Sequence, residues 1–112
     1  MSDLLIEKLR KARQSVVEVE GFKFTIRRPT DAEASSMPTL TAAEVAFKFV
    51  VGWEGVKELD IIPGGNPVDV PFNSLLWIEW CQDKPGFWAP ITEAVLASYK
   101  RHRQVVDETE KN

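Results

Sequence analysis

Cys81 and His102 are the first candidates for chemistry in this sequence, and each is the only residue of its type. A single cysteine cannot form an intrachain disulfide, and one cysteine with one histidine is too few for the usual Cys/His zinc site. Catalysis of the Ser-His-Asp or Cys-His kind would depend entirely on His102, which shares the apolar stripe of an expected helix with Tyr99. The thiol beside Trp80 is typical of a small buried group. We therefore expect packing roles for both residues and no metal site.

The acidic and glycine-rich motifs of the middle region give no stronger sign of catalysis. Glu54 with Glu58, and Asp60 with Asp69, form carboxylate pairs in or near an acidic loop that has no apolar wall around it. Gly64-Gly65 lacks the lysine and the following helix of a phosphate loop. The sequence therefore predicts a protein that is not an enzyme and that needs no cofactor.

Length and composition are those of one ordinary globular domain. The chain has 112 residues, of which 44% are hydrophobic and 28% are charged. No apolar run approaches the ~18 residues that a membrane-spanning helix needs, and the N-terminus lacks the pattern of a secretory signal. These features predict a single domain over residues 1–112, in the cytoplasm and without a membrane partner.

The charge is uneven along the chain. Residues 1–28 carry seven Lys/Arg against four Asp/Glu, whereas residues 29–83 carry two against nine. Lys8 to Arg13 together with Arg27-Arg28 are the residues that a small nucleic-acid-binding regulator would use. Interspersed glutamates and the net charge of −3 favour solvated faces instead. A nucleic-acid regulator is therefore the alternative function, and the principal interpretation has no nucleic-acid partner.

Hydrophobic periodicity predicts an α+β fold that is mainly helical, with about four to five helices and one N-terminal antiparallel β-hairpin at about 16–27. Alternating apolar and polar residues on both sides of Gly21 indicate the hairpin. Thr30 with Glu33, and Thr41 with Glu44, are capping boxes that begin two helices. The expected order is a helix at 1–14, the hairpin at 16–27, an apolar helix at 41–52, a Pro/Gly-rich loop at 56–71, a helix at 73–82, a C-terminal helix at 87–107 and a frayed tail at 108–112.

Large aromatic residues are concentrated in the second half of the chain. All four tryptophans lie between positions 53 and 88, and the expected helices at 41–52 and 73–82 are apolar around most of their circumference. Such residues either fill a core or form the hot spots of an interface, and the sequence leaves both readings open. The candidate partner-binding residues are Phe49, Trp53, Trp77, Trp80 and Trp88.

Short motifs follow one another between residues 20 and 112. They are Ile26-Arg27-Arg28-Pro29-Thr30, then Phe49-Val50-Val51-Gly52-Trp53-Glu54-Gly55-Val56, Pro63-Gly64-Gly65, Pro71-Phe72, Trp80-Cys81-Gln82-Asp83-Lys84-Pro85, Trp88 with its helix, and Glu110-Lys111-Asn112. In this order they resemble the tail assembly chaperones of long-tailed bacteriophages and related prophages. The most specific combination is Trp-Glu-Gly-Val followed by Pro-Phe and then Asp-x-Pro.

The resemblance implies a non-enzymatic assembly factor that acts in the host cytoplasm and is absent from the mature virion. Its implied partners are the tape measure protein, which it keeps soluble, and the tail tube protein, which it helps to recruit. Many members of this family are also made in a longer form by ribosomal frameshifting, so a C-terminally extended form of the chain is a further implied partner. A homo-oligomer is also a candidate, and the sequence leaves the oligomeric state open. Amphipathic segments of the tape measure protein would bind in a groove between the two apolar helices.

Overall fold

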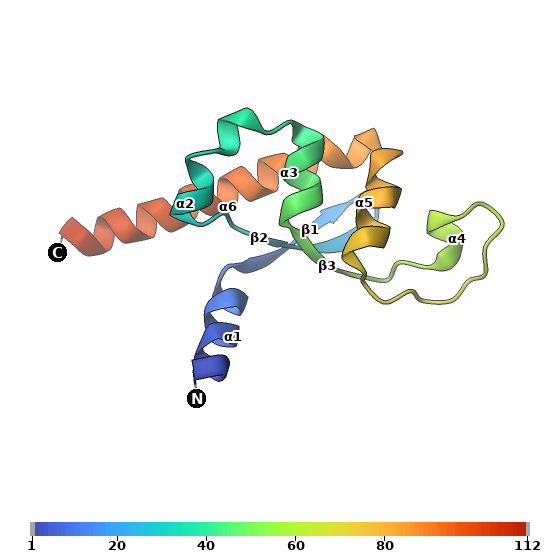
Figure 1. Cartoon of the computed structure of the whole chain (residues 1–112), viewed down its shortest axis with the longest axis horizontal. Coiled ribbons are helices and arrows are strands. Elements are labelled where there is room, and N and C mark those ends of the chain that lie inside the picture. The colour runs from blue at the N-terminus through green and yellow to red at the C-terminus, as the bar shows by residue number, and fades with distance from the viewer. Residues whose placement is uncertain (1, 112) are drawn as a thin grey trace.

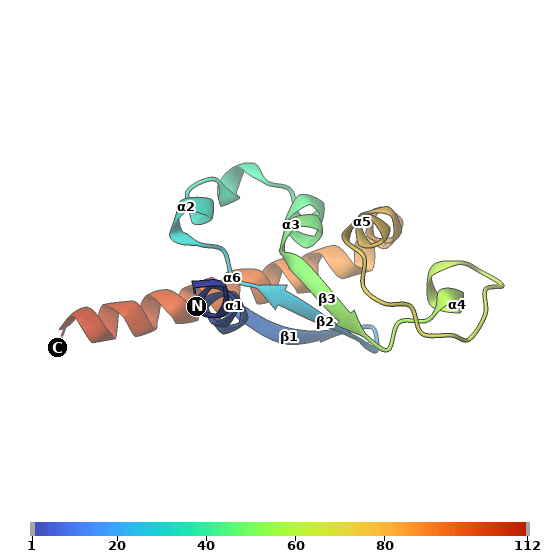
Figure 2. The same cartoon turned by 60° about the horizontal axis from the view of Figure 1, so that its bottom comes forward.

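A three-stranded antiparallel sheet forms the centre of the fold. In this computed structural model, which describes residues 2–111, the strands are β1 (Gln14–Val19), β2 (Phe22–Arg27) and β3 (Val50–Glu54), in the order β1-β2-β3. Exposed and buried side chains alternate along β1 and β2, so one face of the sheet is buried and the other is open to solvent. The domain therefore has two layers, the sheet and the helices that cover its buried face (Figures 1 and 2).

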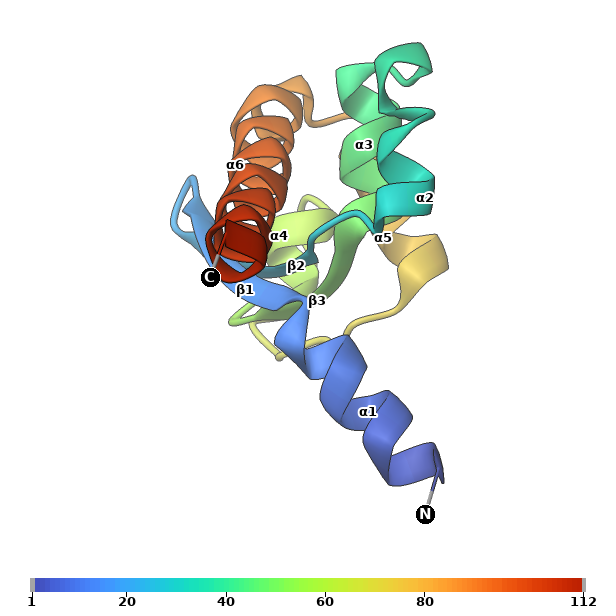
Figure 3. The same ribbon diagram turned by 90° about the vertical axis from the view of Figure 1, so that its left-hand side faces the viewer.

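Three of the six α-helices in the described part of the chain make the covering layer. These are α3 (Ala42–Phe49), α5 (Ser74–Gln82) and α6 (Pro85–Lys111), and α6 continues well beyond the sheet (Figure 1). The short helices α2 (Asp31–Ala34) and α4 (Glu58–Ile61) lie in the connections. The N-terminal helix α1 (Ser2–Ala12) points away from the body of the domain (Figure 3).

The predicted hairpin is confirmed, with strands that cover 14–27 rather than 16–27. Val17 pairs with Phe24 on the buried face, and Glu18 pairs with Lys23 on the open face. Positive φ angles at Glu20 (52°) and Gly21 (84°) make the tight two-residue turn whose twist suits a hairpin. Cross-strand charge pairing and turn geometry thus agree on one register.

The apolar helix expected at 41–52 ends early. It stops at Phe49, and the next five residues form β3, whose Val50 pairs with Ile26. Two adjacent β-branched valines favour an extended backbone, and the open edge of β2 supplies hydrogen-bond partners. A Cβ at position 52 would lie 3.3 Å from Cβ of Thr25, which shows how closely this strand approaches β2 at Gly52. The hairpin is therefore part of a three-stranded sheet.

Other boundaries differ from the expectation for local reasons. The Pro/Gly-rich loop at 56–71 contains α4, so the helix count exceeds four to five. The C-terminal helix starts at Pro85 rather than at 87, and it continues to Lys111 through the tail expected to fray at 108–112. An ion pair between Arg103 and Asp107, one helical turn apart, stabilises this last part. The helix expected at 73–82 is confirmed, and Oδ1 of Asn73 accepts hydrogen bonds from the first turn.

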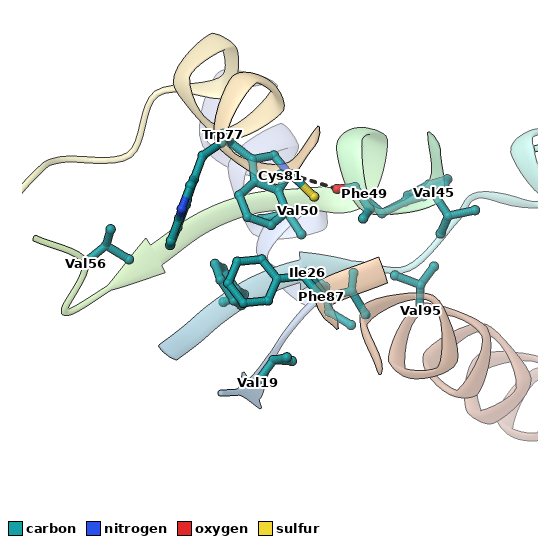
Figure 4. Close-up of a cluster of buried hydrophobic side chains, with 14 residues drawn as sticks. Val19, Ile26, Val45, Phe49, Val50, Val56, Trp77, Cys81, Phe87 and Val95 are labelled. Carbon is teal, nitrogen blue, oxygen red and sulfur yellow. Dashed lines mark hydrogen bonds between the residues drawn. The ribbon is translucent and has the colours of Figure 1, made fainter. Parts of the chain in front are cut away.

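The core lies between the sheet and the covering helices. Figure 4 shows side chains from β2, α3, α5 and α6 pointing into one shared interior. Aromatic rings fill its centre, where the ring of Trp77 stacks on Phe87 with centroids 6.0 Å apart and lies 5.0 Å from Phe24. Aliphatic residues complete the packing, among them Ile26, Val45, Val50, Ile91 and Val95.

Both predicted capping boxes are present, and the first is tied to the sheet. The hydroxyl of Thr30 accepts a hydrogen bond from the backbone N–H of Glu33, whose carboxylate accepts one from the N–H of Thr30. Arg27 donates two hydrogen bonds to the same carboxylate, at 2.7 and 3.0 Å, and Lys48 lies 3.7 Å away. These donors, led by Arg27, lower the pKa of Glu33 from an ordinary 4.5 to about 2.

Acid should therefore remove part of the stability through Glu33. Because the folded-state pKa lies below the unfolded one, the stabilisation is complete above pH 4.5 and is lost as the pH falls towards 2. The loss is at most about 3 kcal/mol. Urea unfolding between pH 2 and 6 should show this slope in the wild type and a flatter one in Glu33→Gln. Glu44→Gln, in the exposed second capping box, is the control, and an equal flattening there would contradict the assignment.

Candidate interaction surface

The five candidate aromatic residues belong mostly to the core. Phe49 and Trp77 are 0% exposed and Trp80 is 6% exposed, whereas Trp53 and Trp88 are half-buried. Direct contact between a partner and the rings of Phe49 or Trp77 would require the core to open. The structure thus brings the candidates together mainly as a packing cluster. Trp53 and Trp88 keep part of their surface for a partner, and Trp80 keeps only a small exposed edge.

Three of the four indole N–H groups bind backbone carbonyls within the domain. Trp77 donates to the carbonyl of Ala46 at 2.9 Å, near the end of α3, where helix carbonyls lack partners. Trp88 donates to Cys81 at 2.8 Å, and Trp53 donates to Val70 at 2.7 Å. These bonds tie helices and a loop to one another, so the tryptophans orient the elements as well as filling space.

The motif residues around Trp53 hold the long loop against the sheet. The ring of Trp53 meets that of Phe72 edge to face with centroids 5.0 Å apart, close to its hydrogen bond with Val70. Gly55 makes the turn out of β3 with a φ of 77°. Trp-Glu-Gly-Val and Pro-Phe are therefore the two ends of one clamp that closes the loop at 56–71.

Inside this clamp the loop is bonded to itself. Lys57 and Asp69 form an isolated antiparallel bridge, and the N–H of Glu58 donates to the carbonyl of Val68 at 3.0 Å. A Cβ on Gly65 would lie 3.0 Å from the carbonyl oxygen of Glu58, so only glycine allows this approach. The backbone hydrogen bonds make the loop a defined support for α4.

An open groove of about 540 Å³ lies between α4 and α5. We call it the α4–α5 groove. Leu59 and Ile61 come from α4, and Leu76 and Trp80 come from α5. Other exposed apolar side chains belong to the same two segments, with Leu75 the most exposed at 73%. A concave apolar surface with further apolar residues beside it is typical of a site for another protein chain.

The rim of the α4–α5 groove is acidic. Asp60, Glu79 and Asp83 line it together with one cation, Lys84. An apolar floor with carboxylates at the edge favours an amphipathic helix whose apolar stripe is bordered by lysines or arginines.

The helix α1 offers a second apolar surface. Leu5, Ile6 and Leu9 lie on one side of it, and all are exposed, Leu5 at 69%. An isolated helix of 11 residues is marginally stable in water. Contact with another chain would stabilise α1, since the domain itself buries none of these side chains.

The two residues first considered for chemistry have structural surroundings. Cys81 is a buried free thiol, and burial raises its pKa to about 11, which keeps it protonated and unreactive. His102 is half-buried, with its ring centroid 6.3 Å from that of Tyr99. Among residues 2–111, no three His, Cys, Asp or Glu side chains gather as a metal site would require.

The groove residues of α4 were missing from the sequence-based candidates. Leu59 and Ile61 stand in a segment that its prolines and glycines mark as a loop. The signal that could have found them is the apolar pair Ile61-Ile62 within an otherwise polar loop, together with Asp60, whose carboxylate caps the N–H of Lys57 at 2.8 Å.

The chain matches no protein-family model, no curated protein and no solved structure. Within the described residues, no helix combines the length and apolar character needed to cross a membrane.

Proposed function

We propose that this protein is a tail assembly chaperone of a long-tailed bacteriophage or prophage. It binds the tape measure protein in the host cytoplasm, aids recruitment of tail tube subunits, and is absent from the mature virion. The observation that carries the proposal is the acidic-rimmed α4–α5 groove, held in place by the motif residues on which the family resemblance rests.

The chemistry of the groove suits one helical segment of the tape measure protein. Such a segment would place apolar side chains against Leu59, Leu76 and Trp80 and basic side chains beside the rim carboxylates. Burying one large apolar side chain contributes roughly 1.5–3 kcal/mol. Two or three anchors of this kind contribute about 3–9 kcal/mol, which offsets much of the cost of association. The rim charges add attraction and select the orientation of the helix.

The position of α1 suits recruitment of a further subunit. This helix points away from the body of the domain, and none of its exposed leucines lines the α4–α5 groove. One molecule could then hold a tape measure segment in the groove and a second chain on α1. Two separate contacts on one small protein are what bringing tail tube subunits to a tape measure requires.

Co-expression with a tape measure protein of a long-tailed phage tests the proposal. We expect the tape measure protein to become soluble and to co-purify with the full chain, and hydrogen exchange to slow at residues 58–63 and 75–84 of the complex. An unrelated coiled coil of equal length is the control. Failure to solubilise the tape measure protein, or equal binding of the control, would contradict the proposal.

A further inference from the structure

A basic pocket of about 410 Å³ lies where α1, the sheet and α6 meet. We call it the arginine pocket. Its basic side chains come from three separate parts of the chain: Arg13 precedes β1, Arg28 follows β2, and Arg101 and His102 belong to α6. Gln14 and Ser15 add neutral polar groups, and no lining residue is acidic. It shares no residue with the α4–α5 groove, so it is a separate site.

The sheet register places two like charges opposite each other. Gln14 pairs with Arg27, and the next position continues the ladder, where the N–H of Arg28 donates to the carbonyl of Arg13 at 2.8 Å. Like charges directly across two antiparallel strands destabilise the pair. The fold thus fixes two guanidinium groups side by side at a cost in stability.

Helix α6 adds its charge from the other side. Ser98, Arg101, His102 and Val105 all line the pocket, and their spacing of three and four residues puts them on one face of the helix. The helix packs across β1 and β2, so this face lies over the ends of the strands that carry Arg13 and Arg28. The cations therefore converge on one space instead of spreading over the surface.

No carboxylate lines the pocket, so the positive charge of its arginines is not neutralised there. Nε of Arg13 is the one buried side-chain nitrogen or oxygen without a hydrogen bond in the described part of the chain. The carboxylate of Asp31 acts on Arg28 from outside the pocket, and it is already engaged by the hydroxyl of Tyr99 at 2.8 Å and by Arg103 at 3.3 Å. Burial, followed by the charge of Arg13, lowers the pKa of Arg28.

We propose that the arginine pocket binds a phosphate group. A tetrahedral phosphate has enough acceptor oxygens to bond the guanidinium groups of Arg13, Arg28 and Arg101 at once. Its negative charge removes the repulsion between the two opposed arginines. A free phosphate, a small phosphorylated molecule and the backbone of a nucleic acid all present this group, so the test distinguishes these sources.

Titration of the full-length protein with inorganic phosphate tests the site. The ionic strength is held constant with chloride, and the side-chain Nε–H signals of Arg13 and Arg28 are followed in ¹⁵N–¹H NMR spectra. We expect both signals to shift with phosphate concentration until the site is saturated. Arg13→Gln and Arg28→Gln should each weaken binding by about tenfold or more, because each loses charged hydrogen bonds. Lys100→Gln is the matched control, since it removes an exposed cation of α6 that does not line the pocket.

Parallel titrations with adenosine monophosphate and a short single-stranded oligonucleotide identify the source. Saturable binding of inorganic phosphate or the monophosphate, lost in the two variants, supports a small phosphorylated ligand. Binding of the oligonucleotide alone, lost in the same variants, supports the phosphate of a nucleic-acid backbone. The proposal is overturned if phosphate shifts these NMR signals no more than chloride does. It is also overturned if the variants bind phosphate with the affinity of the wild type.

Folding of the variants is checked by thermal melting. Because Arg13 and Arg28 repel each other, Arg13→Gln without phosphate should melt no lower than the wild type. If either variant fails to fold, Arg101→Gln decides, because its exposed side chain carries no fold contact whose loss could mimic loss of binding. Retained binding in a folded Arg101→Gln protein would then count against the site.

Discussion

Replacing Trp77 with alanine is expected to lower the free energy of unfolding by about 3 to 5 kcal/mol. The side chain is 0% exposed and contacts the rings of Phe24, Phe87 and Trp80. Its removal leaves a large cavity and also deprives the carbonyl of Ala46 of a donor. Since domains of this size are stable by roughly 5–15 kcal/mol, urea unfolding should show a large loss.

Two further substitutions separate the effect of the cavity from the effect of the lost hydrogen bond. Trp77→Phe keeps much of the ring but loses the indole N–H, so it should cost less than alanine and still about 1 kcal/mol or more. Leu75→Ala, on the same helix but 73% exposed, should change the stability by no more than ~0.5 kcal/mol. Wild-type stability in Trp77→Ala would show that the ring does not support the core.

Charge reversal at the rim of the α4–α5 groove is expected to weaken the proposed binding of the tape measure protein by about tenfold or more. Glu79→Lys combined with Asp83→Lys replaces attraction for a basic helix by repulsion, and neither carboxylate makes a hydrogen bond within the described fold. Calorimetry at low and high salt should show the largest difference from wild type at low salt, where charges are least screened.

A variant with the same net charge outside the groove provides the control. Glu93→Lys combined with Glu110→Lys changes the charge equally on α6 and should bind the tape measure protein almost as the wild type does. Equal weakening in both double variants would mean that overall charge, and not the groove, governs binding.

The parts of the fold that sequence predicts well are those determined by neighbouring residues. Alternation around Gly21 defines the hairpin, and the two capping boxes begin helices at the expected residues. The side-chain oxygen of Asn73 likewise caps the beginning of α5. Each of these signals acts over a few residues, so it can be read directly from the sequence, and here the tertiary fold agrees with it.

The errors arise where a distant partner decides the local structure. Val50 to Trp53 are apolar enough to continue a helix, and pairing with β2, more than twenty residues earlier, decides in favour of the strand that the two valines also favour. The candidate aromatics show the same limit. Their apolar surroundings indicate burial, but whether Trp77 or Trp53 faces the core depends on packing between helices that periodicity cannot place.

The sequence alone also does not show which charged residues lie close together in the fold. Arg13, Arg28 and Arg101 are plain in the sequence as basic residues, but their meeting depends on the register of the hairpin and on the path of α6. The acidic rim likewise joins Asp60 with Glu79 and Asp83 across the clamped loop. Composition could predict the charges, whereas only the fold brings them to one site.

The direct junction between α3 and β3 has a mechanical consequence. Phe49 is the last helical residue and Val50 is already paired with Ile26, so no loop residue separates the helix from the strand. Any bending between them must change the backbone angles of Phe49 or Val50, and both side chains are buried in the core. We therefore expect a displacement of β3, which carries Trp53, to be passed to α3 and from there to α6, which packs against α3.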